Sequence, residues 1–161
     1  MALRREKKVV KMRVLFVDSM NDLPSQLAEY WTRKTYPDLY EAYSAGPEHD
    51  IVDCDLLGVM YGIGEDLRGQ VSKDFSDDKV LPKDGRYDYV VYTQQDVFEA
   101  LARKSPWQGR QICAHLGTRK EFQCTDDKEL AECLVAMSDR VREWVIANMD
   151  DPAKLGELVS A

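Results

Sequence analysis

The stretch VLFVDSMNDLPSQLAE, Val14 to Glu29, joins an apolar run to a polar turn and then to a segment that opens on a proline. The apolar run belongs to residues 12–19, which are rich in valine and lack polar alternation. This pattern is typical of a central parallel strand covered on both faces. Pro24 suits the first turn of a helix, where no backbone amide donor is needed. We therefore predict a strand, a loop and a helix, with Asp18 at the end of the strand.

The rest of the chain alternates between strand and helix patterns. β-branched and aromatic residues at 87–94 predict a strand, and the regular apolar spacing at 127–149 predicts a long helix. Strands that alternate with helices indicate a single doubly wound α/β domain, with a four-stranded parallel sheet and helices on both faces. The expected strands are 12–19, 39–46, 87–94 and 110–117, and the expected helices are 24–36, 52–64, 96–104 and 127–149.

Length and charge narrow the class of protein. The chain has 161 residues, 44% of them hydrophobic, which is enough for one compact domain. We assign it to residues 12–149, between a basic N-terminal extension at 1–11 and a C-terminal tail at 150–161. The net charge is -7 and acidic residues are spread along the chain, which excludes a nucleic-acid partner. The basic start has no apolar signal region and no later run approaches membrane-spanning length, so we predict a cytoplasmic protein without a membrane partner.

Four cysteines, Cys54, Cys113, Cys124 and Cys133, form no C-x-x-C motif, and the chain has two histidines. This spacing signals neither a zinc site nor a disulfide framework. The cysteines are interpreted as small buried hydrophobic residues of a reducing compartment, with a redox pair of Cys124 and Cys133 as the alternative. No cofactor is predicted.

The order of motifs in the first 46 residues carries more information than any one of them. Apolar Val14–Val17 is followed by Asp18, Asn21, Pro24 and Ser25, then by Gln26, Ala28 and Glu29, and later by Ser44-Ala45-Gly46. This frame resembles the low-molecular-weight protein tyrosine phosphatases and the thioredoxin-coupled arsenate reductases, which begin V-L-F-V-C-x-x-N-x-x-R-S, continue Q-x-A-E and end a second strand with S-A-G. The similarity to these families extends through residues 59–75 and 87–93. The resemblance implies the phosphotyrosine-phosphatase-I-like fold, for which we predict strand order 2-1-3-4.

Departures from the family pattern bear on catalysis. The family's nucleophilic cysteine falls at Asp18, and its phosphate-binding arginine falls at Pro24. A carboxylate in that position repels an oxyanion, by about 4 kcal/mol for unit charges 4 Å apart at an effective dielectric near 20. The family's Asp-Pro general acid after the fourth strand is also missing, and Glu121 aligns with it only loosely. The resemblance therefore implies a degenerate phosphate loop that lacks the nucleophile, the arginine and the acid.

The scaffold of the loop is retained. In the family, the loop asparagine and the serine of S-A-G hold the loop by hydrogen bonds, and here they are Asn21 and Ser44. If the loop keeps its shape, its backbone amides still need an acceptor. We expect a carboxylate of the protein itself, Asp18 or Asp22, to fill that nest. The degenerate loop consists of Asp18, Ser19, Met20, Asn21, Asp22, Leu23, Pro24 and Ser25.

Other interpretations of these residues remain open at this stage. Asp18 and Asp22 are a weak candidate for a Mg²⁺ site, because two carboxylates fall short of a complete oxygen ligand set. His115, at the end of the fourth expected strand, is interpreted as a satisfied histidine and alternatively as a general base. Tyr92 and Trp107 are candidates for a recognition surface, since ligand clefts of open α/β sheets lie at strand carboxyl ends.

The sequence favours a catalytically inactive phosphatase-like domain that acts as a binding, regulatory or structural module. Its partner is an unknown protein or small molecule, and its oligomeric state is open. The alternative is an enzyme of altered chemistry on the same scaffold. That enzyme would use Asp18 with a metal ion for phosphate chemistry, or other residues, such as Cys124 or Cys133, for phosphatase or reductase activity.

Overall fold

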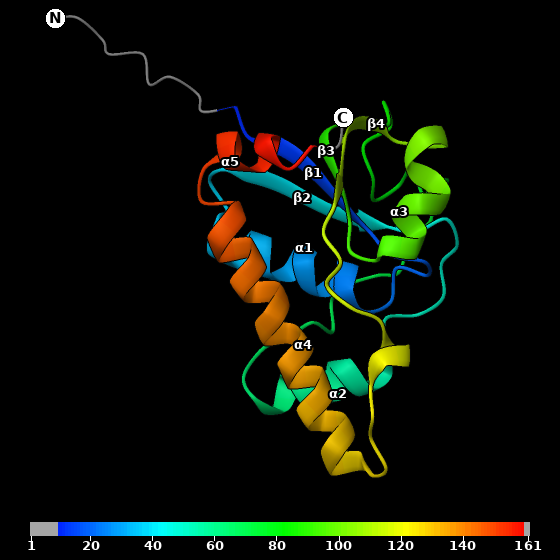
Figure 1. The fold of residues 1–161 in the computed structure, drawn as a ribbon, viewed down its shortest axis with the longest axis vertical. Coiled ribbons are helices and arrows are strands. Elements are labelled where there is room, and N and C mark those ends of the chain that lie inside the picture. Colours follow the sequence, from blue (N-terminus) through cyan, green and yellow to red (C-terminus); the bar gives the residue numbers. More distant parts are fainter. Residues whose placement is uncertain (1–9, 160–161) are drawn as a thin grey trace, which may run out of the picture.

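The centre of the molecule is a four-stranded parallel sheet with strand order β2-β1-β3-β4 (Figure 1). The structure is a computed structural model that describes residues 10–159, so residues 1–9 of the predicted basic extension lie outside it. The predicted α/β class and strand order are confirmed. The strands are β1 (Met12–Val17), β2 (Tyr40–Ala45), β3 (Arg86–Tyr92) and β4 (Gln108–Cys113).

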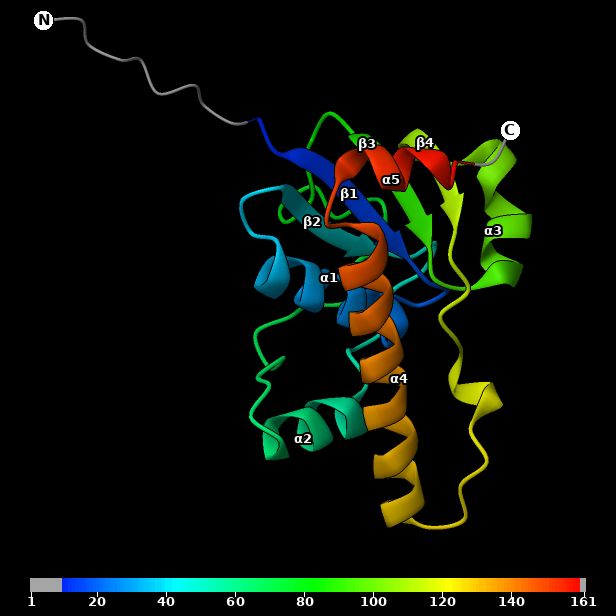
Figure 2. The ribbon, with the colours of Figure 1, turned by 60° about the vertical axis from the view of Figure 1, so that its left-hand side comes forward.

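Helices cover both faces of the sheet, α1 and α4 on one and α3 on the other (Figures 1 and 2). Pro24 opens α1, as predicted, and the Asp126 side chain caps the first turn of α4. Within residues 10–159, no helix combines the length and apolar character needed to cross a membrane. The helices are α1 (Pro24–Thr35), α2 (Cys54–Gly62), α3 (Gln95–Leu101), α4 (Asp127–Asn148) and α5 (Pro152–Glu157), with 3-10 turns η1 (Ala102–Lys104) and η2 (Arg119–Glu121).

The apolar run of β1 feeds two hydrophobic cores. Val14 and Phe16 point into the core shared with α1, α2, α4 and α5. Leu15 and Val17 point into the core shared with α3 and the loops around it. All four side chains are buried, which explains why the strand shows no polar alternation. β1 is therefore held between two packed layers, and the loop that follows it starts from a fixed point.

Tyr92 and Trp107 belong to the second core and form no recognition surface. Tyr92 is 0% exposed and Trp107 is 3% exposed, and both pack in the cluster that also holds Leu15. The prediction is right that Tyr92 lies at the carboxyl end of a strand, but Trp107 precedes β4 and lies at the amino edge of the sheet, and both residues are buried rather than exposed. Tyr92 points into the face covered by α3, and its ring meets Phe98 edge to face with centroids 5.5 Å apart.

The C-terminal segment also differs from the prediction of a frayed tail. Residues Pro152–Glu157 form α5, which Asp151 caps through the Ala153 amide. Leu155 is completely buried in the larger core, and Val159 pairs with Ile112 of β4 in an antiparallel bridge. Asp151 and Pro152 therefore start a helix that belongs to the packed domain.

Candidate functional site

Residues 18–25 form a tight loop between β1 and α1, at the carboxyl end of the central strand (Figure 1). In open α/β sheets this edge is where ligand clefts form. Neighbouring strands hold the loop in place: the Thr93 amide donates to the Val17 carbonyl, and the Ser19 amide donates to the side chain of Gln94 at 3.1 Å. The loop is thus anchored before its first polar side chain, Asp18, turns inward.

Asp18 is 0% exposed, and the loop is wrapped around its carboxylate. Oδ1 accepts hydrogen bonds from the amides of Met20 at 3.2 Å and Asp22 at 3.3 Å. Oδ2 accepts from the amides of Leu23 at 3.4 Å and Ser25 at 3.0 Å, and from the Ser25 hydroxyl at 2.7 Å. One side chain therefore satisfies four backbone amides and a hydroxyl.

This arrangement is an anion nest whose anion belongs to the chain. Several amides that converge on one point create a local positive potential that favours a negative charge. We expected Asp18 or Asp22 to supply that charge, and the carboxylate of Asp18 does so. Pro24 leaves a gap between the Leu23 and Ser25 donors, because proline has no amide hydrogen.

Asn21 fixes the bend of the loop. Its φ of 50° lies in the left-handed region, and among the described residues it is the one non-glycine residue with a positive φ. Its side chain donates to the Ser25 hydroxyl at 2.9 Å and accepts from the Gln26 side chain at 2.9 Å and from the Lys73 amide at 2.8 Å. These three bonds hold a conformation that asparagine tolerates better than most residues.

Ser44 does not bond to Asn21, which corrects the support expected from the family pattern. Its hydroxyl is buried and has no hydrogen-bond partner among the described residues. The side chain of Asn21 instead accepts from Gln26 and Lys73 and donates to Ser25. Loop support therefore comes from α1 and from the segment around Lys73.

Gly46, directly after β2, lies against the backbone of the loop. From the sequence, it is interpreted only as the end of a strand. A Cβ at this position would lie 2.6 Å from the Asp18 carbonyl oxygen, 2.7 Å from the Glu48 carbonyl oxygen and 3.0 Å from the Asn21 amide. The Gly46 amide donates to the Lys73 carbonyl at 2.9 Å. The signal was present as the Gly-Pro pair, but a close backbone approach cannot be told from a turn without the fold.

A buried ion pair behind the loop was also missed. Glu29 of α1 is 2% exposed and Lys73 is 5% exposed, and the ammonium lies 3.8 Å from the carboxylate. Burial raises the pKa of Glu29 and lowers the pKa of Lys73, since both charges lose water. Lys73 also donates to the Val71 carbonyl at 2.7 Å. The pair ties α1 to the segment that supports Asn21 and Gly46.

Negative charge surrounds the mouth of the loop. Burial, together with the nearby carboxylates of Asp18, Asp53 and Asp50, raises the pKa of Asp22 to about 6. Asp53 caps α2 through the Leu56 amide at 3.1 Å, and its amide donates to the Asp22 carbonyl. Arg119 forms ion pairs with Asp53 and Asp55, so its charge is already neutralised. The mouth therefore repels oxyanions.

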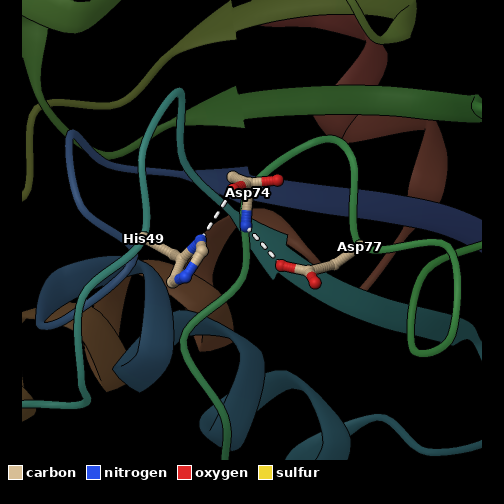
Figure 3. Close-up of side chains that lie close together, drawn as sticks. All are labelled: His49, Asp74 and Asp77. Carbon is tan, nitrogen blue, oxygen red and sulfur yellow. Dashed lines mark hydrogen bonds and ion pairs between the residues drawn. The ribbon is translucent and has the colours of Figure 1, made fainter.

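A metal site at Asp18 and Asp22 has no support in this geometry, because both oxygens of Asp18 accept from the loop. Among residues 10–159, the group with metal-like spacing is elsewhere: His49, Asp74 and Asp77 bring ligand atoms within 4.8 Å of one another (Figure 3). Hydrogen bonds within the chain already connect them. His49 Nδ1 lies 2.6 Å from Asp74, and the Asp74 amide donates to Asp77 at 2.9 Å. The cluster is a link between two loops.

His115 and the four cysteines are the remaining candidates from the sequence. The Nδ1 atom of His115 accepts from the Gln95 amide at 3.1 Å, and Nε2 lies 2.8 Å from Glu121, so both ring nitrogens have partners. This arrangement matches a satisfied histidine better than a free general base. All four cysteines are free thiols; Cys54 and Cys124 are exposed, and Cys113 and Cys133 are half-buried. Full burial, as predicted, is therefore wrong for all four.

Solved structures with the same fold are phosphatases and an arsenate reductase. The tyrosine phosphatase AmsI from Erwinia amylovora is 16% identical with a TM-score of 0.60, and the match covers 89% of this chain and 97% of that one. The tyrosine phosphatase Wzb from Escherichia coli K30, in complex with sulphate, is 18% identical with a TM-score of 0.61, covering 86% and 99%. An arsenate reductase in the phosphate binding state is 20% identical with a TM-score of 0.53, covering 84% and 95%.

These similarities establish the fold of the chain. No family model matches the sequence. No curated protein sequence matches it significantly. The architecture is thus that of the low-molecular-weight phosphatases and arsenate reductases, at sequence identities of 16–20% to the three structures described.

Replacing Asp18 by asparagine should destabilise the protein. The amide nitrogen of asparagine cannot accept the donors that now converge on one carboxylate oxygen, so buried amides lose their partner. We expect a loss of about 2–4 kcal/mol in the free energy of unfolding, measured by urea denaturation. Asp50→Asn, which removes an exposed charge near the loop, is the control and should change stability by less than about 0.5 kcal/mol. Equal stability of both variants would contradict the anion-nest interpretation.

Gly46→Ala should also destabilise the protein, because the new methyl group would collide with two backbone carbonyls. We expect a loss of about 1–3 kcal/mol in the free energy of unfolding. Gly69→Ala is the matched control, since a Cβ there meets nothing within 4 Å. Thermal denaturation of the two variants side by side checks the difference, and a Gly46→Ala variant as stable as Gly69→Ala would refute it.

Asp22→Asn should stabilise the protein in a pH-dependent manner. The folded-state pKa of about 6 lies above the ordinary value of 3.8, so the native protein takes up a proton as the pH falls through this window. The charged form therefore costs stability above pH 6, and the cost disappears below about pH 4. We expect a gain of about 1 kcal/mol at pH 7.5, allowing for the half-exposed side chain, and almost none at pH 4. Asp78→Asn, at an exposed loop position, should show no such dependence in the same titration.

Proposed function

We propose that this protein is a catalytically inactive, phosphatase-like module that acts by binding rather than by phosphate chemistry. The observation that carries the proposal is the Asp18 carboxylate, which accepts hydrogen bonds from four amides of its own loop. In the family that the sequence resembles, this position holds the attacking cysteine and the amides hold phosphate. An internal acceptor therefore takes the place of both the nucleophile and the ligand.

The chemistry of the surrounding residues supports the same proposal. A nucleophile must be reachable, and Asp18 is 0% exposed with both oxygens engaged. Pro24 stands where the family pattern places the arginine that binds phosphate, and it offers neither a guanidinium nor an amide. Asp22 adds negative charge at the mouth. An oxyanion that approached would meet repulsion of about 4 kcal/mol per unit charge at 4 Å and an effective dielectric near 20.

Two of the similar structures provide the contrast. The Escherichia coli Wzb phosphatase was solved with sulphate, and the arsenate reductase was solved in a phosphate binding state. We infer that the corresponding loop here has exchanged an external oxyanion for the Asp18 carboxylate. The partner that the module binds is a protein or a small molecule, contacted through loops at the strand ends.

The single domain predicted from the sequence is proposed again here, with its C-terminal boundary extended. We propose a single domain that starts near residue 12 and includes α5, because Leu155 is buried in the larger core. We further propose a cytoplasmic location. Its support is the presence of four free thiols, two of them exposed, which persist in a reducing compartment.

Oxyanion binding and turnover test the function. Wild-type protein should show no saturable binding of phosphate or vanadate at millimolar concentration, followed by amide shifts in NMR spectra, and no hydrolysis of p-nitrophenyl phosphate with or without Mg²⁺. Asp18→Ala frees the four amides and should gain phosphate binding, whereas Asp50→Asn removes a nearby charge without freeing them and should not. The double variant Asp18→Cys with Pro24→Arg should bind oxyanions more tightly still.

Two results would overturn the proposal. Hydrolysis by the wild type that is lost in Asp18→Ala would establish an enzyme of altered chemistry. Saturable phosphate binding by the wild type, with shifts confined to the amides of residues 18–25, would show that Asp18 leaves the nest for an external anion.

A further inference from the structure

α2 packs beside the N-terminal half of α4 (Figure 2). A shallow apolar groove of about 600 Å³ lies between the two helices. Gly58 and Gly62 line it from α2, and Ala131, Val135 and Ala136 line it from α4. Ile63, just past the end of α2, is 55% exposed at its edge. The groove lies along the C-terminal half of α2, whereas the loop at 18–25 adjoins the N-terminus of that helix.

The two glycines of α2 have no explanation within the described part of the chain. Neither has a positive φ, and a Cβ on Gly58 or Gly62 would meet nothing within 4 Å. Gly64, with a φ of 89°, already supplies the left-handed turn after the helix. Each glycine within a helix costs about 0.5–1 kcal/mol relative to alanine. Missing side chains on an exposed helix face permit another backbone to approach closely, and no segment of residues 10–159 does so.

The α4 side of the groove has opposite charges at its two ends, so it is complementary in charge to a second copy of α4 that runs antiparallel. Lys128, Ala131, Glu132, Val135, Ala136 and Asp139 recur at three- and four-residue intervals and share one helix face. A cation begins this stripe and an anion ends it, about 16 Å apart along the axis. Neither Lys128 nor Asp139 has an ion-pair partner among residues 10–159.

We propose that this groove is a dimerisation surface and that its occupant is a second copy of the chain. When two copies of α4 lie antiparallel about a two-fold axis, Lys128 of each copy meets Asp139 of the other, and Ala131 meets Ala136. The small residues between the ion pairs let the helices approach closely, and α4 of the second copy lies over Gly58 and Gly62. Isologous contacts of this kind are the commonest way in which identical chains associate. The inference does not depend on the state of the loop at 18–25.

Glu132 sets the strength of the contact. In the antiparallel register it lies beside the two-fold axis, so the two copies of Glu132 come within about 5 Å along the helix axis. Like charges at that separation repel each other and oppose association. The dimer is therefore weak and concentration-dependent. Glu132→Gln removes the repulsion and should tighten the dimer several-fold.

Charge reversal tests both the surface and the identity of the occupant. Sedimentation velocity between about 10 μM and 1 mM should show wild-type self-association. Lys128→Asp alone and Asp139→Lys alone should each weaken it by about tenfold, because both ion pairs become repulsive. An equimolar mixture of these two variants should associate at least as well as wild type, since every pair is again opposite in sign. A monomeric wild type at all concentrations, or a mixture no better than its components, overturns the proposal.

Filling the glycine face separates association from folding. Gly58→Ala should raise the Tm by about 2–4 °C, because alanine favours the helix. Gly58→Leu should abolish association while circular dichroism reports an intact fold. Self-association that survives Gly58→Leu, or a groove that binds an unrelated protein in a chain that stays monomeric, would refute the second copy as occupant.

Discussion

Inward-pointing backbone amides after β1 impose the constraint on which the rest of the structure depends. Four amides converge on one point at the end of a strand whose two faces are buried, so the loop cannot turn them to solvent without losing its shape. Buried amides without an acceptor are costly. The Asp18 carboxylate meets this need from within the chain. Asn21, with its positive φ, and Gly46, which has no side chain to collide with the loop, allow the backbone to bring these amides together.

The sequence was sufficient for the parts of the molecule that depend on local pattern. Valine-rich β1, the proline at the start of α1 and the long stripe of α4 each follow from short-range rules, and the strand order follows from the resemblance. The internal hydrogen-bond acceptor could also be predicted from the sequence. A loop that keeps its shape while the residue at the strand end changes has few ways to satisfy its backbone amides. The choice between Asp18 and Asp22 needed coordinates, since both lie within the same eight residues.

Features that depend on long-range contacts could not be obtained in this way. Tyr92 ends β3 as the sequence predicts, but only the packing of α3 reveals that it faces a core, and Trp107 lies at the opposite edge of the sheet in the same core. Ser44 is retained without its expected bond, and Asn21 is held instead by Lys73, which lies 52 residues after it in the sequence. The burial of Leu155 depends on where a short helix docks after α4. Each of these errors concerns a partner far away in sequence, which one unaligned chain does not disclose.

An acceptor attached to the loop has a strong advantage over a dissolved one. A tethered group acts at an effective concentration set by its geometry, of about millimolar for flexible tethers and far higher for groups already held in place. Asp18 is fixed by β1 on one side and by five hydrogen bonds on the other. A free oxyanion must displace a carboxylate that never diffuses away, and it must approach past the charge of Asp22. In the proposed function, the tethered carboxylate is what keeps the loop closed to phosphate.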